Sequence, residues 1–200
     1  MILRSSPASP FGRKVKIAAH VLGLLDRVKI VNADTLNPED DLRQQNPLGK
    51  IPTLILENGK VLYDSRVIVE YFDQAAGGGR LIPAKGDERF DVLVMQSLAD
   101  GIMDAAILQI YEIRFRAEEH REAKWVSHQA GKIDRALSAL EAHPPHITPV
   151  PHIGTIAIAC ALGYLDLRFE GQWRKNHPRL VAWLDDFSAR VPAFAATAPH

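Results

Sequence analysis

The sequence predicts a mixed α/β domain followed by an all-helical domain. Strand-like and helix-like patterns alternate over residues 1–76, whereas strand signals almost vanish after the glycine run at 77–79. An Asn-Gly pair at 58–59, set between two apolar runs, predicts a β-hairpin inside the first part. These observations define the fold class and its order along the chain.

The first elements are a strand, a helix and a second strand. Residues 1–4 form a short apolar run ended by Ser-Ser-Pro, and 28–31 are rich in β-branched residues. Between them, 10–22 has helical periodicity, and Gly23 ends the helix. Its apolar face carries Phe11, Val15, Ala18, Ala19 and Leu22, with Arg13, Lys14 and Lys16 on other faces.

The next elements complete a β-α-β-α-β-β-α order. A polar stretch at 36–45 predicts a loop with a brief helix, 53–56 and 61–63 are the hairpin strands, and 65–76 is a helix. A βαβ unit makes a parallel strand pair with a right-handed crossover, and the hairpin adds antiparallel strands to the same sheet. This is the thioredoxin-like arrangement.

The remainder of the chain predicts only helices. Residues 153–167 are apolar on nearly every side, which indicates a helix buried inside a bundle. The predicted helices are 87–116, 123–142, 153–167 and 178–190. We therefore divide the chain into a thioredoxin-like domain at 1–77, a linker at 78–86 and an all-helical domain at 87–200.

Composition excludes several classes of function. The 24 basic and 24 acidic residues cancel and no like-charged run stands out, which argues against a nucleic-acid-binding protein. One cysteine, no signal-peptide pattern and no long apolar run predict a cytoplasmic protein without a membrane span. Cys160 is predicted to be a buried, inert thiol. His143, His146 and His152 lie among prolines without ligand-spaced partners, so no metal site is expected.

Several motifs, spread in order over almost the whole chain, resemble the cytosolic glutathione S-transferase family, in particular its bacterial, serine-type members. In the first half they are Ser-Pro-Phe-Gly-Arg-Lys-Val at 9–15, Asn-Pro-Leu-Gly-Lys-Ile-Pro-Thr-Leu at 46–54 and Asp-Ser at 64–65. In the second half they are Ala-Asp-Gly-Ile-Met-Asp-Ala at 99–105, Ala-Leu-Gly-Tyr-Leu-Asp at 161–166, and the C-terminal segments at 173–183 and 190–194.

The resemblance implies a glutathione site in the first domain. It implies that Pro52 is cis, so that the backbone of Ile51 pairs with the cysteinyl part of glutathione; an ordinary trans turn is the alternative. Ser65 is a natural N-cap after Asp64, and that helix end suits the γ-glutamyl carboxylate, with Asp64 accepting from the ammonium group. Lys50 either holds the glycine carboxylate or is a solvated loop lysine.

Ser9 is the candidate catalytic residue. On structural grounds alone it caps the helix that begins at Pro10, and that role explains it fully. The resemblance implies that its hydroxyl contacts the glutathione sulfur, where a donor and the positive helix end favour thiolate over thiol. Ser5 and Ser6 are rivals because they lie close in sequence.

The helical domain supplies the remaining candidates. In dimeric relatives an aspartate of the first long helix reaches the partner's glutathione ammonium, which suggests Asp100 or Asp104, although surface solvation or helix capping explains them too. Phe11, together with the pair Tyr111 and Phe115, is a candidate lining for the hydrophobic co-substrate; an aromatic pair at this spacing also suits a core.

One departure from the family concerns the buried helix. Relatives begin it with a Ser or Thr cap and an Asp, whereas His152 and Thr155 stand here. We expect a stability lower by about 1 kcal/mol or slower folding. The predicted function is a homodimeric, detoxifying transferase that directs the glutathione thiolate at a small hydrophobic electrophile. The alternatives are a non-catalytic glutathione-binding or protein-interaction member of the fold and, less favoured because Ser9 is not cysteine, a glutathione-dependent reductase.

Overall fold

A single mixed sheet forms the first part of the computed structural model, which describes residues 1–199. The strands are β1 (Ile2–Ser5), β2 (Lys29–Asn32), β3 (Thr53–Ile55) and β4 (Val61–Leu62), in the sheet order β2-β1-β3-β4. β1 pairs parallel with β2 and antiparallel with β3, and β3 pairs antiparallel with β4. The predicted βαβ unit and hairpin are thus both confirmed.

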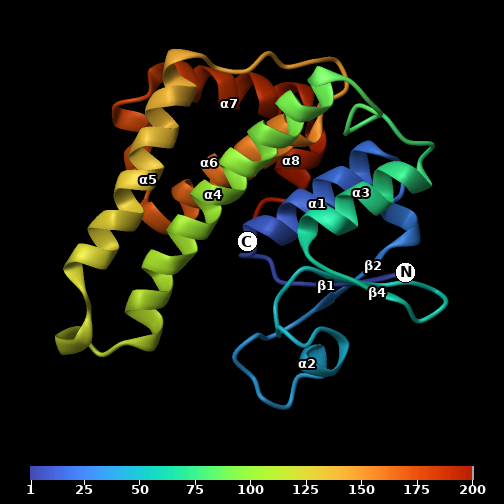
Figure 1. The fold of residues 1–200 in the computed structure, drawn as a ribbon, viewed down its shortest axis with the longest axis horizontal. Helices are drawn as coiled ribbons and strands as arrows, with labels where there is room; N and C mark the ends of the chain where they lie inside the picture. Colours follow the sequence, from blue (N-terminus) through green and yellow to red (C-terminus); the bar gives the residue numbers. More distant parts are fainter. Residues whose placement is uncertain (200) are drawn as a thin grey trace.

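Three helices accompany this sheet. They are α1 (Pro10–Val21), α2 (Leu42–Gln45) and α3 (Ser65–Ala75). Helices α1 and α3 lie side by side on one face of the sheet, and the short α2 lies on the other side (Figure 1). The predicted thioredoxin-like arrangement is confirmed.

The second part is a helical bundle. Its helices are α4 (Asp87–Phe115), α5 (Ala123–Ala142), α6 (Ile153–Phe169), α7 (Pro178–Arg190) and α8 (Pro192–Ala196). Short 3₁₀ turns occur at Leu25–Arg27, Glu118–His120 and Gln172–Lys175. Helix α6 packs along α4 and α1, and nearly all its residues are buried, as predicted. Helix α8 was not predicted; its five residues are too few to show a periodic pattern.

Helix α1 lies where the two parts of the structure meet (Figure 1). It contacts α3 on one side and α4, α6 and α8 on the other, so it has no fully solvated face. Arg13 and Lys14, which lie off its apolar face, are consequently buried rather than exposed, with 6% and 0% of their surface accessible. Burial of these two cations is the main feature that the helical pattern did not predict.

The segment between α3 and α4 is held by Asp73. Its carboxylate accepts hydrogen bonds from the backbone N–H groups of Gly79, Arg80 and Leu81, at 2.7–3.0 Å. The carbonyl of Leu81 in turn accepts from the N–H of Ile153, at the start of α6. One buried carboxylate therefore fixes the linker against both parts of the molecule.

The start of α6 corrects the expectation of a poor cap. His152 Nδ1 accepts from the backbone N–H of Thr155 at 3.3 Å, and Thr155 Oγ1 donates to the carbonyl of His152 at 2.9 Å. An imidazole nitrogen therefore replaces the Ser or Thr oxygen of the family's cap. The Thr155 hydroxyl bonds to the carbonyl of His152 and not to its N–H, so only the first half of the reciprocal motif is present.

Helix α4 is long and apolar enough to cross a membrane by length and composition alone. Core helices of soluble proteins meet the same criteria, and α4 packs along both α5 and α6. We therefore interpret α4 as a core helix of the bundle.

Candidate functional site

Ser9 lies at the N-terminal end of α1, half-buried. Its Oγ accepts a hydrogen bond from the N–H of Gly12 at 3.0 Å, which makes it the N-cap of the helix. The hydroxyl donates to no residue among those described (1–199), so its proton is available to a ligand. The side chain thus caps the helix and keeps a free donor at the positive end of the helix dipole.

The two neighbouring serines are placed differently. Ser5 ends β1 and is 1% exposed, and its Oγ lies 2.1 Å from the position that a Cβ on Gly12 would occupy. A side chain at position 12 would clash with Ser5, so glycine is required at this position, and α1 covers Ser5. Ser6 is half-buried in the turn that follows. Of these two rivals, Ser5 has no open path to a ligand in this structure.

The end of β3 provides free backbone groups near Ser9. The Ile51–Pro52 peptide bond is cis, and neither the N–H nor the C=O of Ile51 has a partner within residues 1–199. Thr53, which follows Pro52 and begins β3, pairs with Arg4 on β1, and the chain continues from β1 to Ser9. Ile51 therefore presents an unpaired strand-like edge on the same side of the sheet as the N-terminus of α1.

Lys50 lies at the exposed side of this edge. Its carbonyl accepts from Asn46 Nδ2 and Thr53 Oγ1, at 3.0 and 2.9 Å, while its side chain extends into solvent. The buried Asn46 side chain thereby fixes the loop that carries both Lys50 and Ile51. The ammonium group is exposed and could meet an anion, so both expectations for Lys50 stay open.

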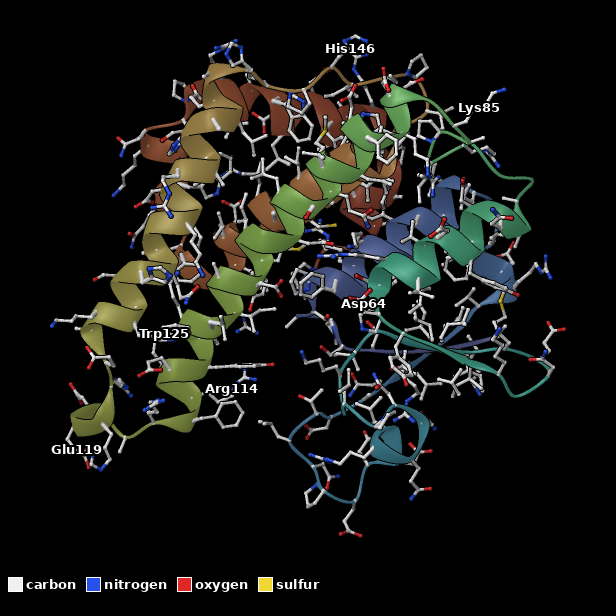
Figure 2. All side chains as sticks on the ribbon, in the orientation of Figure 1. Asp64, Lys85, Arg114, Glu119, Trp125 and His146 are labelled. Carbon is white, nitrogen blue, oxygen red and sulfur yellow. The ribbon has the colours of Figure 1, made fainter. Side chains whose placement is uncertain are left out.

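The N-terminus of α3 differs from the prediction in one respect. Asp64, not Ser65, is the N-cap: its Oδ1 accepts from the N–H of Arg66 at 2.9 Å. Ser65 is the first helical residue, and neither its backbone N–H nor its Oγ has a partner among the described residues. Because the cap is provided by Asp64, the residue before, the Ser65 donors stay available for an anion. Figure 2 shows Asp64 at the end of α3 nearest to α4.

A buried ion network connects this helix end to α1 and α4. Lys14 Nζ lies 2.6 Å from Asp100 Oδ1, and Arg66 Nε lies 2.8 Å from Asp100 Oδ2. Asp100 is 1% exposed, so both its oxygens are engaged and covered. In this structure the Asp100 carboxylate therefore has no open path to a ligand bound in a second subunit. The hydrogen bond to Asp100 raises the pKa of Arg66 and holds the Arg66 side chain against α4.

Asp104 lies one turn after Asp100 on α4, and of these two aspartates it is the exposed one. Its pKa is raised by partial desolvation and by the negative charge of Asp100, while Arg66 and Lys50 act in the opposite direction. Lys50 belongs to the sheet domain and Asp104 to the bundle, so opposite charges from the two parts lie within electrostatic range. This arrangement suits a zwitterionic ligand between them.

The aromatic candidates for the co-substrate site lie on α1 and α4. Tyr111 and Phe115 are 40% and 60% exposed and form an edge-to-face pair with centroids 5.2 Å apart. Phe11 lies half-buried beside Lys14, with 5.5 Å between the ammonium and the ring. Beside Ser9, a small space is instead lined by Tyr164 and other α6 residues. Tyr164 belongs to one of the motifs that resemble the family. The sequence could not identify it as a pocket residue, because α6 is apolar on nearly every side and its pattern does not distinguish pocket-lining residues from core residues.

No metal centre is found in the described part of the chain, where no three His, Cys, Asp or Glu residues are grouped to hold an ion. Cys160 is fully buried on α6, and burial raises the pKa of its thiol to about 12. Such a thiol is not a nucleophile near neutral pH. The chemistry available here comes from hydroxyl, backbone and charged groups around an incoming ligand.

A thioredoxin-like sheet with free donors at two helix ends, joined to a helical bundle, defines a glutathione-transferase-type fold and site. Residues 8–75 match the family described as Glutathione S-transferase, N-terminal domain, and residues 123–186 match Glutathione S-transferase, C-terminal domain. The GST-like protein YibF of Escherichia coli K12 is 34% identical over 100% of this chain and 98% of its own length. The chain belongs to the glutathione S-transferase family.

Solved structures agree with this assignment. A glutathione transferase family member from Pseudomonas fluorescens Pf-5, solved with bound glutathione, is 46% identical, with a TM-score of 0.91 and coverage of 100% of this chain and 98% of that one. A glutathione S-transferase from Methylobacillus flagellatus KT, also with glutathione bound, is 34% identical, with a TM-score of 0.91 and coverage of 100% and 99%.

Proposed function

We propose that the protein binds glutathione and activates its thiol as a thiolate for attack on a small hydrophobic electrophile. One observation carries the proposal: Ser9, Ile51 and Ser65 have free donor or backbone groups, and the strand register puts the segments that carry them at one edge of the sheet. These groups match a thiol, a peptide and a carboxylate, which are the parts of glutathione. Relatives that share the whole fold were solved with glutathione bound.

In this proposal each group has a defined task. The Ile51 backbone pairs with the cysteinyl unit beside Pro52, Ser65 N–H and Oγ donate to the γ-glutamyl carboxylate, and Lys50 attracts the glycine carboxylate. Asp64 and Asp104 are the carboxylates near the α3 N-terminus that can receive the ammonium group. Asp100 acts indirectly, because it orients Arg66 beside the same site.

Ser9 supplies the catalytic effect. A hydroxyl proton donated to sulfur, together with the N-terminus of α1, stabilises the thiolate relative to the thiol. The thiolate is the nucleophile, and Ser9 forms no covalent bond. The electrophile then enters from the side of the bundle, where we propose that Phe11, Tyr111 and Phe115 contribute apolar contacts together with Tyr164.

A second subunit belongs to this proposal. Exposed apolar side chains recur one turn apart along α4, and another lies on α3; they are Phe90, Val94, Leu98 and Val67. An apolar stripe of this kind marks a protein interface. We propose a homodimer formed through this α3–α4 face, with Asp104 near its inner edge. The cytoplasmic location and a role in detoxification stay predictions of the sequence.

The test is a glutathione titration followed by thiolate absorbance against pH. For wild type we expect a thiol pKa well below the value of about 8.5 for a free thiol. Ser9→Ala should bind glutathione but return the thiol to its ordinary pKa. Ser6→Ala, in the same turn, is the matched control and should behave as wild type. Glutathione binding without any thiolate would support a non-catalytic member of the fold, and no binding would reject the proposal.

A further inference from the structure

Two arginines near the ends of the long bundle helices, Arg114 on α4 and Arg168 on α6, form no ion pair within residues 1–199. Arg114 is exposed, which is ordinary for a surface cation, whereas Arg168 is half-buried. The Nε atom of Arg168 is buried and has no hydrogen-bond partner in the described part of the chain. Buried polar atoms are nearly always paired in folded proteins, so this donor requires an explanation.

The carboxylates on the same stretches of helix are already neutralised by other arginines. Glu112 lies 3.1 Å from Arg116, and its Oε1 also accepts from the N–H of Glu122 at 2.8 Å. Asp166 lies 2.7 Å from Arg174. The positive charges at the ends of α4 and α6 therefore exceed the negative charges that the described residues place beside them.

Both arginines lie against tyrosine rings. The guanidinium carbon of Arg114 lies 5.8 Å from the centroid of the Tyr111 ring, and that of Arg168 lies 5.8 Å from the centroid of the Tyr164 ring. Burial raises the pKa of the Tyr164 phenol, while the charges of the two arginines act in the opposite direction. Tyr164 thus lies within electrostatic range of both cations, one from each helix, and its phenol keeps a proton that it can donate.

This group of side chains adjoins the proposed active site. Tyr164 lines the small space that touches Ser9. On α4, Tyr111 lies two turns after Asp104 and therefore on the same face, which Asp104 presents to the charged groups of the sheet domain. Figure 2 shows Arg114 near the C-terminal end of α4, on the side toward the sheet domain. The unpaired cations therefore border the space from which an electrophile would approach the glutathione sulfur.

We propose that the electrophile is an aryl acid, whose carboxylate binds Arg114 and Arg168 while its ring packs against Tyr111 and Phe115. Planar guanidinium donors match the two oxygens of a carboxylate, and the exposed edge-to-face aromatic pair offers an apolar surface beside them. The proposal names the substrate class of the function proposed above and rests on that function.

The reaction is a substitution on the ring of the acid. The glutathione thiolate attacks the ring carbon that bears a halide, and a carbon–sulfur bond forms. The carbon–halogen bond breaks, and the halide leaves with the bonding electron pair. The carboxylate is unchanged in the reaction, so its only task is to select and orient the substrate.

The test compares para-chloro-meta-nitrobenzoate with its amide, which has the same ring and leaving group without the charge. For each compound kcat/KM is divided by the rate constant of the uncatalysed reaction with glutathione, which removes the difference in intrinsic reactivity. We expect the acid to be favoured by about tenfold or more, because loss of a charge-paired group leaves the cations unpaired. This advantage should shrink as ionic strength rises.

Three variants connect this preference to the two arginines. Arg114→Gln and Arg168→Gln should each lower the acid-to-amide ratio by about tenfold. Arg114 is exposed, so its substitution does not endanger folding. Arg168 is half-buried, and Arg168→Lys, which keeps the charge, should retain more of the ratio than Arg168→Gln. Arg135→Gln, exposed on α5, is the control with the same charge change and should leave the ratio as in wild type.

A binding measurement separates this proposal from thiolate activation. S-(para-carboxybenzyl)glutathione should bind about tenfold more tightly than S-(para-carbamoylbenzyl)glutathione, measured calorimetrically. If neither chloro compound turns over but the acid conjugate binds more tightly, thiolate activation is wrong and the acid preference stands. The inference is overturned if acid and amide are equal in both assays, if both Gln variants keep the wild-type ratio, if Arg135→Gln lowers it equally, or if neither conjugate binds.

Discussion

Lys14 Nζ lies 2.6 Å from Asp100 Oδ1, and the two side chains are 0% and 1% exposed. The pair joins α1, which presents Ser9, to α4, while Arg66 extends it to the first turn of α3. Three helices that contribute to the proposed glutathione site thus meet at one carboxylate. The network therefore connects the three helices that carry the proposed glutathione site.

Removal of Lys14 should therefore be strongly destabilising. Lys14→Met leaves Asp100 buried with only the half-exposed Arg66, and loss of one partner of a buried pair costs about 3–5 kcal/mol of unfolding free energy. The double variant Lys14→Met/Asp100→Leu should recover much of the loss, because no buried charge remains. Urea denaturation measures both.

Lys16→Met is the matched control for this pair. Lys16 lies on the same helix, and its pKa is lowered by burial and by Arg13. Loss of its charge should be neutral or stabilising. If Lys14→Met and Lys16→Met have the same midpoint, the network has no special role.

Asp104 gives a prediction in which stability and binding change in opposite directions. Its folded pKa is raised above the usual 3.8, so its ionised form costs stability once the pH rises through the folded value. Asp104→Asn should raise the free energy of unfolding at pH 7, and the gain should vanish as the pH falls below 3.8. If Asp104 receives the glutathione ammonium, the same variant binds glutathione more weakly. Asp134→Asn, exposed on α5, is the control with the same charge change and should show neither effect.

The fold was largely predictable because its signals are local. The hairpin at Asn58-Gly59 follows from turn chemistry, and α5 and α7 begin and end where periodicity and Pro178 place them. The apolar pattern of α6 also predicted its burial correctly. Each of these elements carries its own information within a short stretch of sequence.

The site was predicted less completely because it depends on tertiary contacts. Lys14 and Arg13 stand in a basic stretch that, on an isolated helix, would face water; only contacts from α4, α6 and α8 bury them. Arg66 follows two recognised residues but gains its role from Asp100, 34 positions away. The cap of α3 is Asp64, whereas Ser65 was predicted. Both residue types are good caps, and the sequence alone does not give the backbone angles that decide between them.

His152 predicts a pH dependence of folding. Its Nδ1 accepts a backbone N–H, so the cap requires the neutral ring, and burial lowers its pKa below the usual 6.5, with Glu88 opposing. The unfolded chain therefore binds a proton first as the pH falls, and the contribution of this cap is complete above 6.5 and is lost below it. His152→Ser keeps a cap oxygen without a titrating group and should lose less stability between neutral and mildly acidic pH. His146→Ser is the control, and an unchanged slope in His152→Ser would contradict this role.

Asp73 should be the residue on which order in the linker depends. It is 4% exposed and accepts three backbone N–H groups, so Asp73→Ala leaves buried donors unpaired and should cost about 3 kcal/mol of unfolding free energy. Asp73→Asn keeps one carbonyl oxygen for Arg80 and Leu81 but turns an amide toward Gly79, so it should cost less. Hydrogen exchange should accelerate at residues 79–81 in both variants before global unfolding. Asp91→Asn, exposed on α4, is the control; exchange that accelerates uniformly along the chain would show that Asp73 acts on global stability and not on the linker.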